Sequence, residues 1–254
     1  MTHVVAIVNQ KGGVGKTTTT INLGAQLAKD GYKVLIIDSD PQGNATSGLG
    51  LSGNTFEKTT YNLLVSKTPI DKVIQETYIP NLHIIPANPN LAGAEIDLST
   101  MISREFKLKE SLIASTHDFI LIDCPPALGL LSINALTAAD SVLIPVQAEY
   151  YALEGLSQLL NIIQIVKQNI NKKLEILGVV ITMYDKRTSL SEQVLSEIKN
   201  HFGDKVFETI IPRNIRLAEA PSFGKAIYDH DKWSKGARAY KQLAKEVIDR
   251  VSTK

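Results

Sequence analysis

The sequence predicts an α/β fold, with a mostly parallel, twisted sheet and helices on both of its faces. Three observations predict this class. Short apolar runs alternate with helical stretches along the chain. The runs contain few polar interruptions, as strands buried on both faces do, and a glycine-rich turn joins the first run to the first helical stretch. We expect residues 1–254 to form a single domain, since α/β folds of this length commonly form one unit.

The expected strands and helices alternate in order along the chain. Seven apolar runs are expected to form strands at residues 3–8, 34–38, 82–86, 119–123, 141–146, 177–183 and 206–211. The clearest helical stretches lie at residues 16–30, 153–168 and 189–202, and a last one lies at about residues 237–251. Gly31 and Gly203 follow two of these stretches, at the position where glycine commonly ends a helix.

The composition is that of an ordinary globular chain. Of the 254 residues, 44% are hydrophobic and 21% are charged, and the net charge is +1, so the chain can build a sizeable core. The single cysteine, Cys124, excludes a disulfide framework and indicates a reducing, cytoplasmic location. The first strand has no charged and apolar leader before it, and no apolar run approaches 18 residues. We therefore expect neither a secretory signal nor a membrane span.

Residues 11–18 read KGGVGKTT and lie between the first strand and the first helix. Strand, glycine-rich turn and helix form the context that a phosphate-binding loop requires. Lys16 would contact the β- and γ-phosphates of a nucleotide, and the Thr17 hydroxyl would complete the shell of a Mg²⁺ ion. The residues expected to surround the phosphates are Lys11, Gly12, Gly13, Val14, Gly15, Lys16, Thr17 and Thr18.

This loop departs from the common pattern G-x-x-x-x-G-K-[ST]. Gln10 stands where the first glycine is expected, and an additional lysine, Lys11, lies five residues before Lys16. The loop is too tight for both lysines to point inward from one chain. We therefore expect Lys11 to reach a nucleotide held by a second subunit, which predicts a dimer.

Two predicted strands end in aspartate at the sheet edge where the loop opens. Asp123 ends an apolar strand, as the carboxylate that binds magnesium directly or through water does in nucleotide hydrolases. We expect Asp38 near the metal as well, and Asp40, two residues further on, to position or activate the attacking water. The expected metal site is thus Thr17, Asp38 and Asp123. The alternative for each aspartate is a turn former or a helix N-cap.

Several segments in combination resemble the ParA/Soj family of chromosome- and plasmid-partitioning ATPases. They are KGGVGKTT at 11–18, DSDPQGNAT at 38–46, IDCPP at 122–126, PVQ at 145–147 and IPRNIRLAEAPS at 211–222. The resemblance covers essentially the whole chain. It implies a P-loop ATPase fold with the deviant Walker A loop, and ATP and Mg²⁺ as cofactors. It also implies a nucleotide-sandwich homodimer in the ATP-bound state.

The resemblance further implies weak ATP hydrolysis that a ParB/Spo0J-type partner and DNA stimulate. The ATP-bound form would bind double-stranded DNA without sequence preference, and so associate with the nucleoid. The resemblance makes Lys11 the lysine that acts in trans, Lys16 the phosphate-binding lysine and Asp40 the residue needed for hydrolysis. It also implies that Pro212 and Asn214 lie near the adenine.

The charge distribution points to the C-terminal part as the nucleic-acid surface. Residues 183–254 hold 14 Lys/Arg and 10 Asp/Glu, whereas residues 1–182 hold 13 and 16. Basic loops without a base-reading helix are typical of salt-sensitive phosphate contacts that carry no sequence information. The expected DNA contacts are Lys186, Arg187, Arg213 and Arg216. The resemblance favours Arg187 and Arg216, and the alternative for each is an ordinary solvated cation.

Other activities on the same loop remain as alternatives. The nearest is a MinD-like membrane-cycling ATPase, which ends in a basic amphipathic helix. The last predicted helix has mixed charges on its polar face, so we expect it to pack on the domain, without stable membrane association. An iron–sulfur protein is excluded, because a bridging cluster needs four thiolates and two chains supply two copies of Cys124. A cobyrinic acid or dethiobiotin type synthetase, or a non-hydrolysing binding module, is less favoured.

Overall fold

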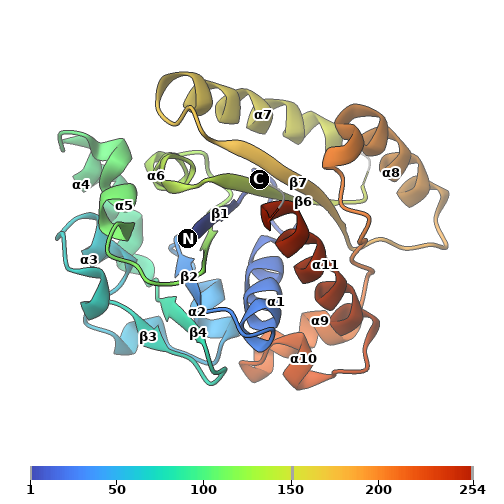
Figure 1. Ribbon diagram of the computed structural model, residues 1–254, viewed down its shortest axis with the longest axis horizontal. Helices are drawn as coiled ribbons and strands as arrows, with labels where there is room; N and C mark the ends of the chain where they lie inside the picture. The colour runs from blue at the N-terminus through green and yellow to red at the C-terminus, as the bar shows by residue number, and fades with distance from the viewer. Residues whose placement is uncertain (1, 150–151, 253–254) are drawn as a thin grey trace.

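The computed structural model describes residues 2–149 and 152–252. Its centre is a seven-stranded sheet in the order β3-β4-β2-β5-β1-β6-β7, and every neighbouring pair is parallel except β3 with β4 (Figure 1). The strands are β1 His3–Ile7, β2 Val34–Asp38, β3 Gln75–Glu76, β4 Leu82–Ile85, β5 Phe119–Asp123, β6 Ser141–Gln147 and β7 Glu175–Thr182. The order places β1 between β5 and β6, so the segments that follow β1 and β5 emerge side by side.

Helices connect the strands and cover the sheet. The α-helices are α1 Lys16–Lys29, α2 Asn44–Gly48, α3 Thr60–Leu64, α4 Ala94–Ser99, α5 Lys107–Leu112, α6 Leu130–Ala138, α7 Ala152–Asn169, α8 Ser189–Phe202, α9 Ile215–Glu219, α10 Ile227–His230 and α11 Lys235–Ser252. The short 3₁₀ helices are η1 Gly53–Thr55, η2 Ile70–Lys72, η3 Pro89–Gly93, η4 Arg104–Phe106, η5 Gly203–Lys205 and η6 Ala220–Phe223.

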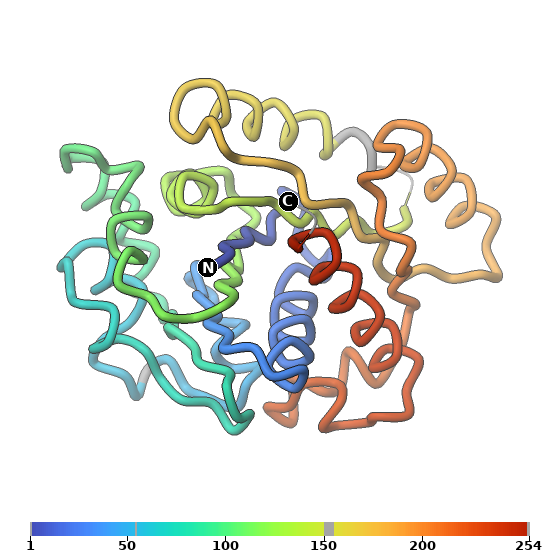
Figure 2. The backbone as a smooth tube through the Cα atoms, in the orientation of Figure 1, coloured from blue at the N-terminus to red at the C-terminus, as the bar shows by residue number. Residues whose placement is uncertain are grey.

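Two apolar cores form, one on each face of the sheet. Side chains alternate along a strand, so Val5 and Ile7 pack with α1, α2 and α11, while Val4 and Ala6 pack with α4 to α7. Helix α11 runs beside α1 along much of its length (Figure 2). Gly24 lets α1 lie close to the sheet, because a Cβ there would approach the Ile36 side chain to 3.0 Å. The predicted fold class and its doubly covered, mostly parallel sheet are confirmed.

The predicted strand at 206–211 is wrong. This segment forms one isolated bridge to β7, between Val206 and Val179, and no continuous strand pairing. The N–H groups of Phe207 and Ile211 donate to the carbonyls of Val179 and Ile181. The step from Phe207 to Ile211 is four residues, whereas the step from Val179 to Ile181 on β7 is two. The segment therefore bulges away from β7. The Glu246 carboxylate on α11 accepts the backbone N–H groups within the bulge.

The structure also contains an edge strand, β3, that has no signal in the sequence. It is two residues long and polar, so it has no alternation of apolar residues from which a strand could be predicted. The last helix, by contrast, packs as predicted: Tyr240, Leu243 and Val247 on α11 are buried against the α1 side of the sheet. Among the described residues, no helix is long and apolar enough to cross a membrane.

Candidate functional site

The glycine-rich loop after β1 curls tightly and leads into α1. Gly13 and Gly15 have φ angles of 74° and 89°, in the region that side chains other than glycine rarely adopt. The Gly15 carbonyl accepts the first helical bond, from Thr19 N–H at 2.9 Å. The Thr182 hydroxyl on β7 donates a hydrogen bond to the Val14 carbonyl at 2.8 Å, and this bond fixes the loop to β7. Backbone N–H groups of the loop thus gather at a helix N-terminus, where an anion is stabilised.

A cavity of about 450 Å³ opens above this loop. Its walls come from the loop, from the segments after β2, β5 and β7, and from η6. The lining residues are Gly12, Gly13, Gly15, Lys16, Thr17, Thr18, Ile21, Asp40, Gln42, Asn44, Ser47, Pro126, Met183 and Pro221. The structure thereby brings most of the predicted loop residues and Asp40 to one cavity, which has the size of a small-molecule site.

Lys16 is the buried cation of the cavity. Its ammonium donates to the Lys11 carbonyl at 3.1 Å. Burial lowers the pKa of Lys16, and the negative charges of Asp123 and Asp40 oppose that shift. The ammonium therefore lies between the loop and a group of carboxylates, where the phosphates of a nucleotide would find it already positioned.

Asp38 and Asp123 end neighbouring strands and are register partners, and both are completely buried. The hydroxyls of Thr17 and Thr20 donate to Asp123, at 2.7 and 3.0 Å. Burial raises the pKa of both carboxyls, and the charge of Asp38 adds to the rise at Asp123. Two buried carboxylates side by side favour a cation in the adjoining cavity.

The residues at this edge fit a magnesium ion that is shared with a phosphate ligand. Thr17 lines the cavity and its hydroxyl donates a hydrogen bond to Asp123, so the lone pairs of its oxygen remain for a metal. The described part of the chain holds no cluster of three or more acidic, histidine or cysteine side chains that would bind a metal unaided. Mg²⁺ suits such a site, because it commonly takes one or two protein ligands and completes its shell with phosphate oxygens and water.

Asp38 and Asp40 differ in what their carboxylates do. Asp38 does not line the cavity, and one of its oxygens accepts both the N–H and the hydroxyl of Thr46, at 2.8 and 2.7 Å. It thereby anchors α2 to β2, and its expected role at the metal stays a prediction. Asp40 lines the cavity, and Gln42 N–H donates to one of its oxygens at 2.9 Å. Its other oxygen has no hydrogen-bond partner among the residues described.

Lys11 does not line the cavity of its own chain. Its ammonium lies 2.7 Å from Glu149, and both side chains are about two-fifths exposed. The Gln147 amide donates to the second oxygen of Glu149. Sequence reasoning missed Glu149, since nothing in the sequence pairs residues that lie 138 positions apart. The two lysines of the loop do point to different places, as the tightness of the loop predicts.

The residues expected at the adenine lie outside the lining of this cavity. Pro212 bridges to Tyr184, and the Asn214 side chain caps α9 by accepting Leu217 N–H at 3.3 Å. Their assignment to the base stays a prediction. Met183 and Pro221 line the cavity instead. Met183 has a positive φ of 51°, which no sequence pattern announces at a methionine.

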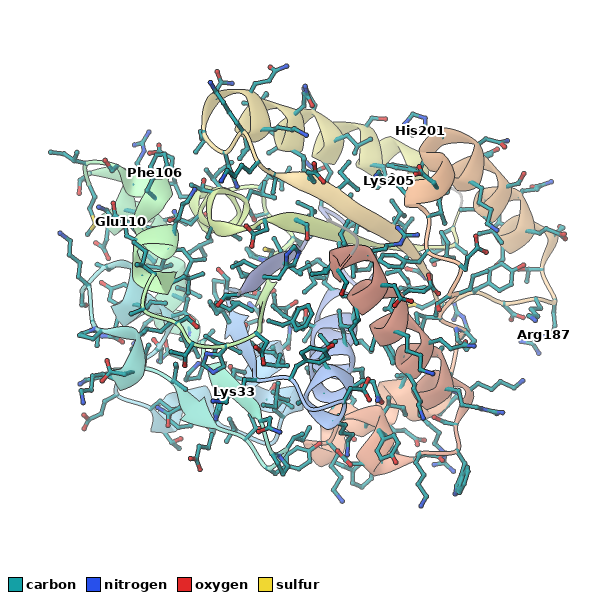
Figure 3. The ribbon with its side chains drawn as sticks, in the orientation of Figure 1. Lys33, Phe106, Glu110, Arg187, His201 and Lys205 are labelled. Atoms are coloured by element: carbon teal, nitrogen blue, oxygen red, sulfur yellow. The ribbon has the colours of Figure 1, made fainter. Side chains whose placement is uncertain are left out.

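The four expected DNA contacts lie on exposed segments but fall into two classes. Arg187 projects from the loop between β7 and α8 (Figure 3) and donates two hydrogen bonds to Asp185, at 2.9 and 2.7 Å. This contact holds the pKa of Asp185 well below its usual range. Arg216 on α9 pairs with Glu219 at 2.9 Å. Lys186 and Arg213 have no ion pair within the described ranges.

Comparison with known proteins adds three findings. The family model described as an AAA domain matches residues 2–176. The chain is 57% identical over 249 residues to the sporulation initiation inhibitor protein Soj of Bacillus subtilis, covering 97% of this chain and 98% of that one. It is 50% identical over 252 residues to the chromosome partitioning protein ParA of Caulobacter vibrioides, covering 98% and 94%.

The fold also matches that of a solved structure. The cobyrinic acid a,c-diamide synthase of Mycobacterium smegmatis, with bound ADP and magnesium, superimposes with a TM-score of 0.88. The two chains are 36% identical, and the match covers all of this chain and 96% of the other. This match agrees with the α/β P-loop NTPase fold of the chain.

Proposed function

This chain belongs to the ParA/Soj family of partitioning ATPases, and from that premise we propose that it is an ATP-driven DNA-partitioning switch. ATP and Mg²⁺ bind in the cavity above the loop. Binding joins two copies into a homodimer that holds double-stranded DNA without reading its sequence. Slow hydrolysis, stimulated by DNA and by a ParB/Spo0J-type partner, returns the monomer and releases the DNA. In the cell the protein is cytoplasmic, and it is nucleoid-associated while ATP is bound.

One observation carries the catalytic part: Lys16, Thr17 and Asp40 line a single cavity, with Asp123 directly behind Thr17. The N–H groups of the loop and the Lys16 ammonium bind the triphosphate. Thr17 and Asp123 would hold the metal, which would supply positive charge to the phosphates. Asp40 has one oxygen fixed by Gln42 N–H, so its other oxygen can orient a water for attack on the γ-phosphate.

The dimer is proposed from Lys11. Its side chain does not line the cavity of its own chain, and within residues 2–149 and 152–252 the contact that holds it is an exposed ion pair with Glu149. Exposed ion pairs contribute about 0–1 kcal/mol, so a triphosphate on a second subunit competes well for this lysine. We propose that Lys11 moves from Glu149 to the partner's nucleotide, and that this contact makes dimerisation depend on ATP.

The DNA surface is proposed to be the basic C-terminal part, with Lys186, Arg187, Arg213 and Arg216. Two of these lie on the β7–α8 loop and two on or beside α9. None of them lies on a helix of the kind that reads base edges, so phosphate contacts are expected to dominate. Dimerisation would double the number of phosphate contacts, which makes DNA affinity depend on ATP.

The alternative is a MinD-like membrane-cycling ATPase. Its membrane contact requires an amphipathic helix with a free apolar face. Here the apolar face of α11 is buried against the α1 side of the sheet, which favours DNA over a membrane as the partner. A synthase activity is less favoured as well, since identity is 57% to Soj and 36% to the synthase structure.

Co-sedimentation with DNA tests the proposal. The wild type and the Asp40→Ala variant are mixed with duplex DNA in the presence of ATP, of ADP and of no nucleotide, at several salt concentrations. Retention on DNA with ATP only, lost progressively with salt and prolonged in Asp40→Ala, supports it. Equal retention in all three nucleotide states contradicts the ATP switch. Binding to anionic vesicles without binding to DNA would transfer the chain to the membrane-cycling class.

A further inference from the structure

Three large apolar side chains are exposed on one part of the C-terminal surface. Ile215, Phe223 and Trp233 are 76%, 64% and 78% exposed, and they lie on α9, on η6 and in the turn before α11. These elements contact one another through α10 (Figure 1). Phe223 stacks on His230 with ring centroids 5.0 Å apart. Single exposed apolar residues are normal, but a group of them on one surface indicates a contact with something else.

The charges around this group favour a polyanion. Arg216 pairs with Glu219 and Asp231, and Lys29 pairs with Asp229, so each of these three acids has a cation beside it. The remaining cations of residues 213–238 have no ion pair with residues 2–149 and 152–252. They are Arg213, Lys225, Lys232, Lys235 and Arg238. The ammonium of Lys232 lies over the Trp233 ring, 5.2 Å from its centroid.

An aromatic ring among unpaired lysines matches the surface of a DNA duplex, where apolar sugar faces and base edges alternate with phosphates. An anionic lipid surface has a similar chemistry, but it takes up an extended apolar helix face. Here the apolar residues stand on three short segments, and the long neighbouring helix α11 has buried its apolar face. The geometry therefore favours DNA.

From this placement we infer that Trp233 contacts DNA directly, as an apolar contact between phosphate-binding lysines. The inference rests on the DNA binding proposed above and adds a residue that carries no charge. Such a contact has a distinct signature. Removal of a phosphate contact lowers the slope of log affinity against log salt by about 0.9, whereas removal of an apolar contact lowers the affinity and leaves the slope unchanged.

The chain contains one tryptophan, so its tryptophan emission, excited beyond the absorption of the tyrosines, reports on this site alone. The protein is saturated with ATP and Mg²⁺ and titrated with a duplex, while the anisotropy of the labelled duplex is followed in parallel. We expect the emission of Trp233 to change with the same concentration dependence as the anisotropy, and to recover when salt is added. Trp233→Ala should weaken DNA binding by about fivefold or more with an unchanged salt slope, and Trp233→Phe should restore most of the affinity.

Two controls accompany these variants. Lys235→Ala, on the same surface, should lower the salt slope by about 0.9. Ile113→Ala removes an apolar side chain of comparable exposure on α5's C-terminal end and should leave DNA binding unchanged.

The outcomes separate this inference from the proposed function. DNA binding without any change in Trp233 emission overturns the inference and leaves the proposed function standing. A missing anisotropy signal with ATP contradicts the DNA binding itself. An emission change on addition of ATP alone, complete before DNA is added, places Trp233 in a contact between subunits and overturns the inference. So does an emission change with vesicles of phosphatidylglycerol that DNA does not produce.

Discussion

The nucleotide cavity and the basic C-terminal surface use charge in opposite ways. In the cavity, the charged groups are buried and held by short hydrogen bonds, as Asp123 is by Thr17 and Thr20. On the basic surface, Arg187 and Arg216 are exposed and paired with acids of the same surface. Charge in a buried site acts at full strength and in one geometry, whereas exposed pairs are screened and exchange partners at little cost. The buried arrangement suits catalysis, and the exposed arrangement suits the reversible DNA binding that we propose.

The largest expected effect comes from removing the buried cation of the cavity. Lys16→Ala should weaken ATP binding by about 100-fold or more, because a charge-assisted contact to phosphate is lost and Asp123 is left without its counter-charge. Isothermal titration calorimetry with ATP and Mg²⁺ measures this. Lys33→Ala, which removes an exposed lysine, is the control and should bind ATP normally. Unchanged affinity in Lys16→Ala would show the loop to be a structural turn.

The second effect concerns the water-positioning role of Asp40. Asp40→Ala should keep ATP and magnesium binding but slow hydrolysis by about 10²- to 10⁴-fold, so that an ATP-bound dimer accumulates. Phosphate release and size-exclusion chromatography with ATP measure the two consequences. Asp71→Ala, which removes one member of an exposed ion pair, should leave both unchanged. Normal turnover in Asp40→Ala would remove the assignment.

The contrast between the two regions also decides what the sequence could predict. The loop, Asp40 and Asp123 follow from short motifs beside predicted strands, because a parallel sheet brings the ends of its strands to one edge. Sequence reasoning placed Lys16, Thr17 and Asp40 together, and the cavity contains all three. The fold class follows from the same alternation of strands and helices.

What the sequence could not give depends on contacts between distant residues. The motif does not show that the Asp38 carboxylate anchors Thr46, and the role of Asp38 at the metal stays a prediction. The apolar run at 206–211 looks like a strand, yet Glu246, far along the chain, accepts its N–H groups and keeps it bulged.

The third effect tests the exposed pairs. Arg187→Ala and Arg216→Ala should each weaken DNA binding similarly on unrelated duplexes and lower the salt slope by about one unit. ATP-driven dimerisation and basal hydrolysis should persist, because neither side chain lines the cavity. Filter binding across a salt series measures this. A double variant that keeps the affinity and salt slope of the wild type would place the DNA surface elsewhere.

The same comparison predicts a gain of affinity from the acid that neutralises Arg187. DNA must displace Asp185 from the guanidinium before a phosphate can take its place. Asp185→Asn should therefore strengthen DNA binding by a few-fold, since exposed pairs are weak, and it should do so only while Arg187 is present. An equal gain in the Arg187→Ala background would show that Asp185 acts on DNA by general repulsion and not through the pair.

The smallest expected effect concerns the exposed ion pair between Lys11 and Glu149, which lies beside the buried cavity. Glu149→Gln should make dimerisation require less ATP, by up to about fivefold, because Lys11 no longer leaves an ion pair worth about 0–1 kcal/mol. The glutamine keeps an oxygen that can accept the hydrogen bond from Gln147, so the local structure is retained. Analytical ultracentrifugation across an ATP series measures the change. In a Lys11→Ala background the same substitution should have no effect, and a shift that persists there would mean that Glu149 acts on the dimer without Lys11.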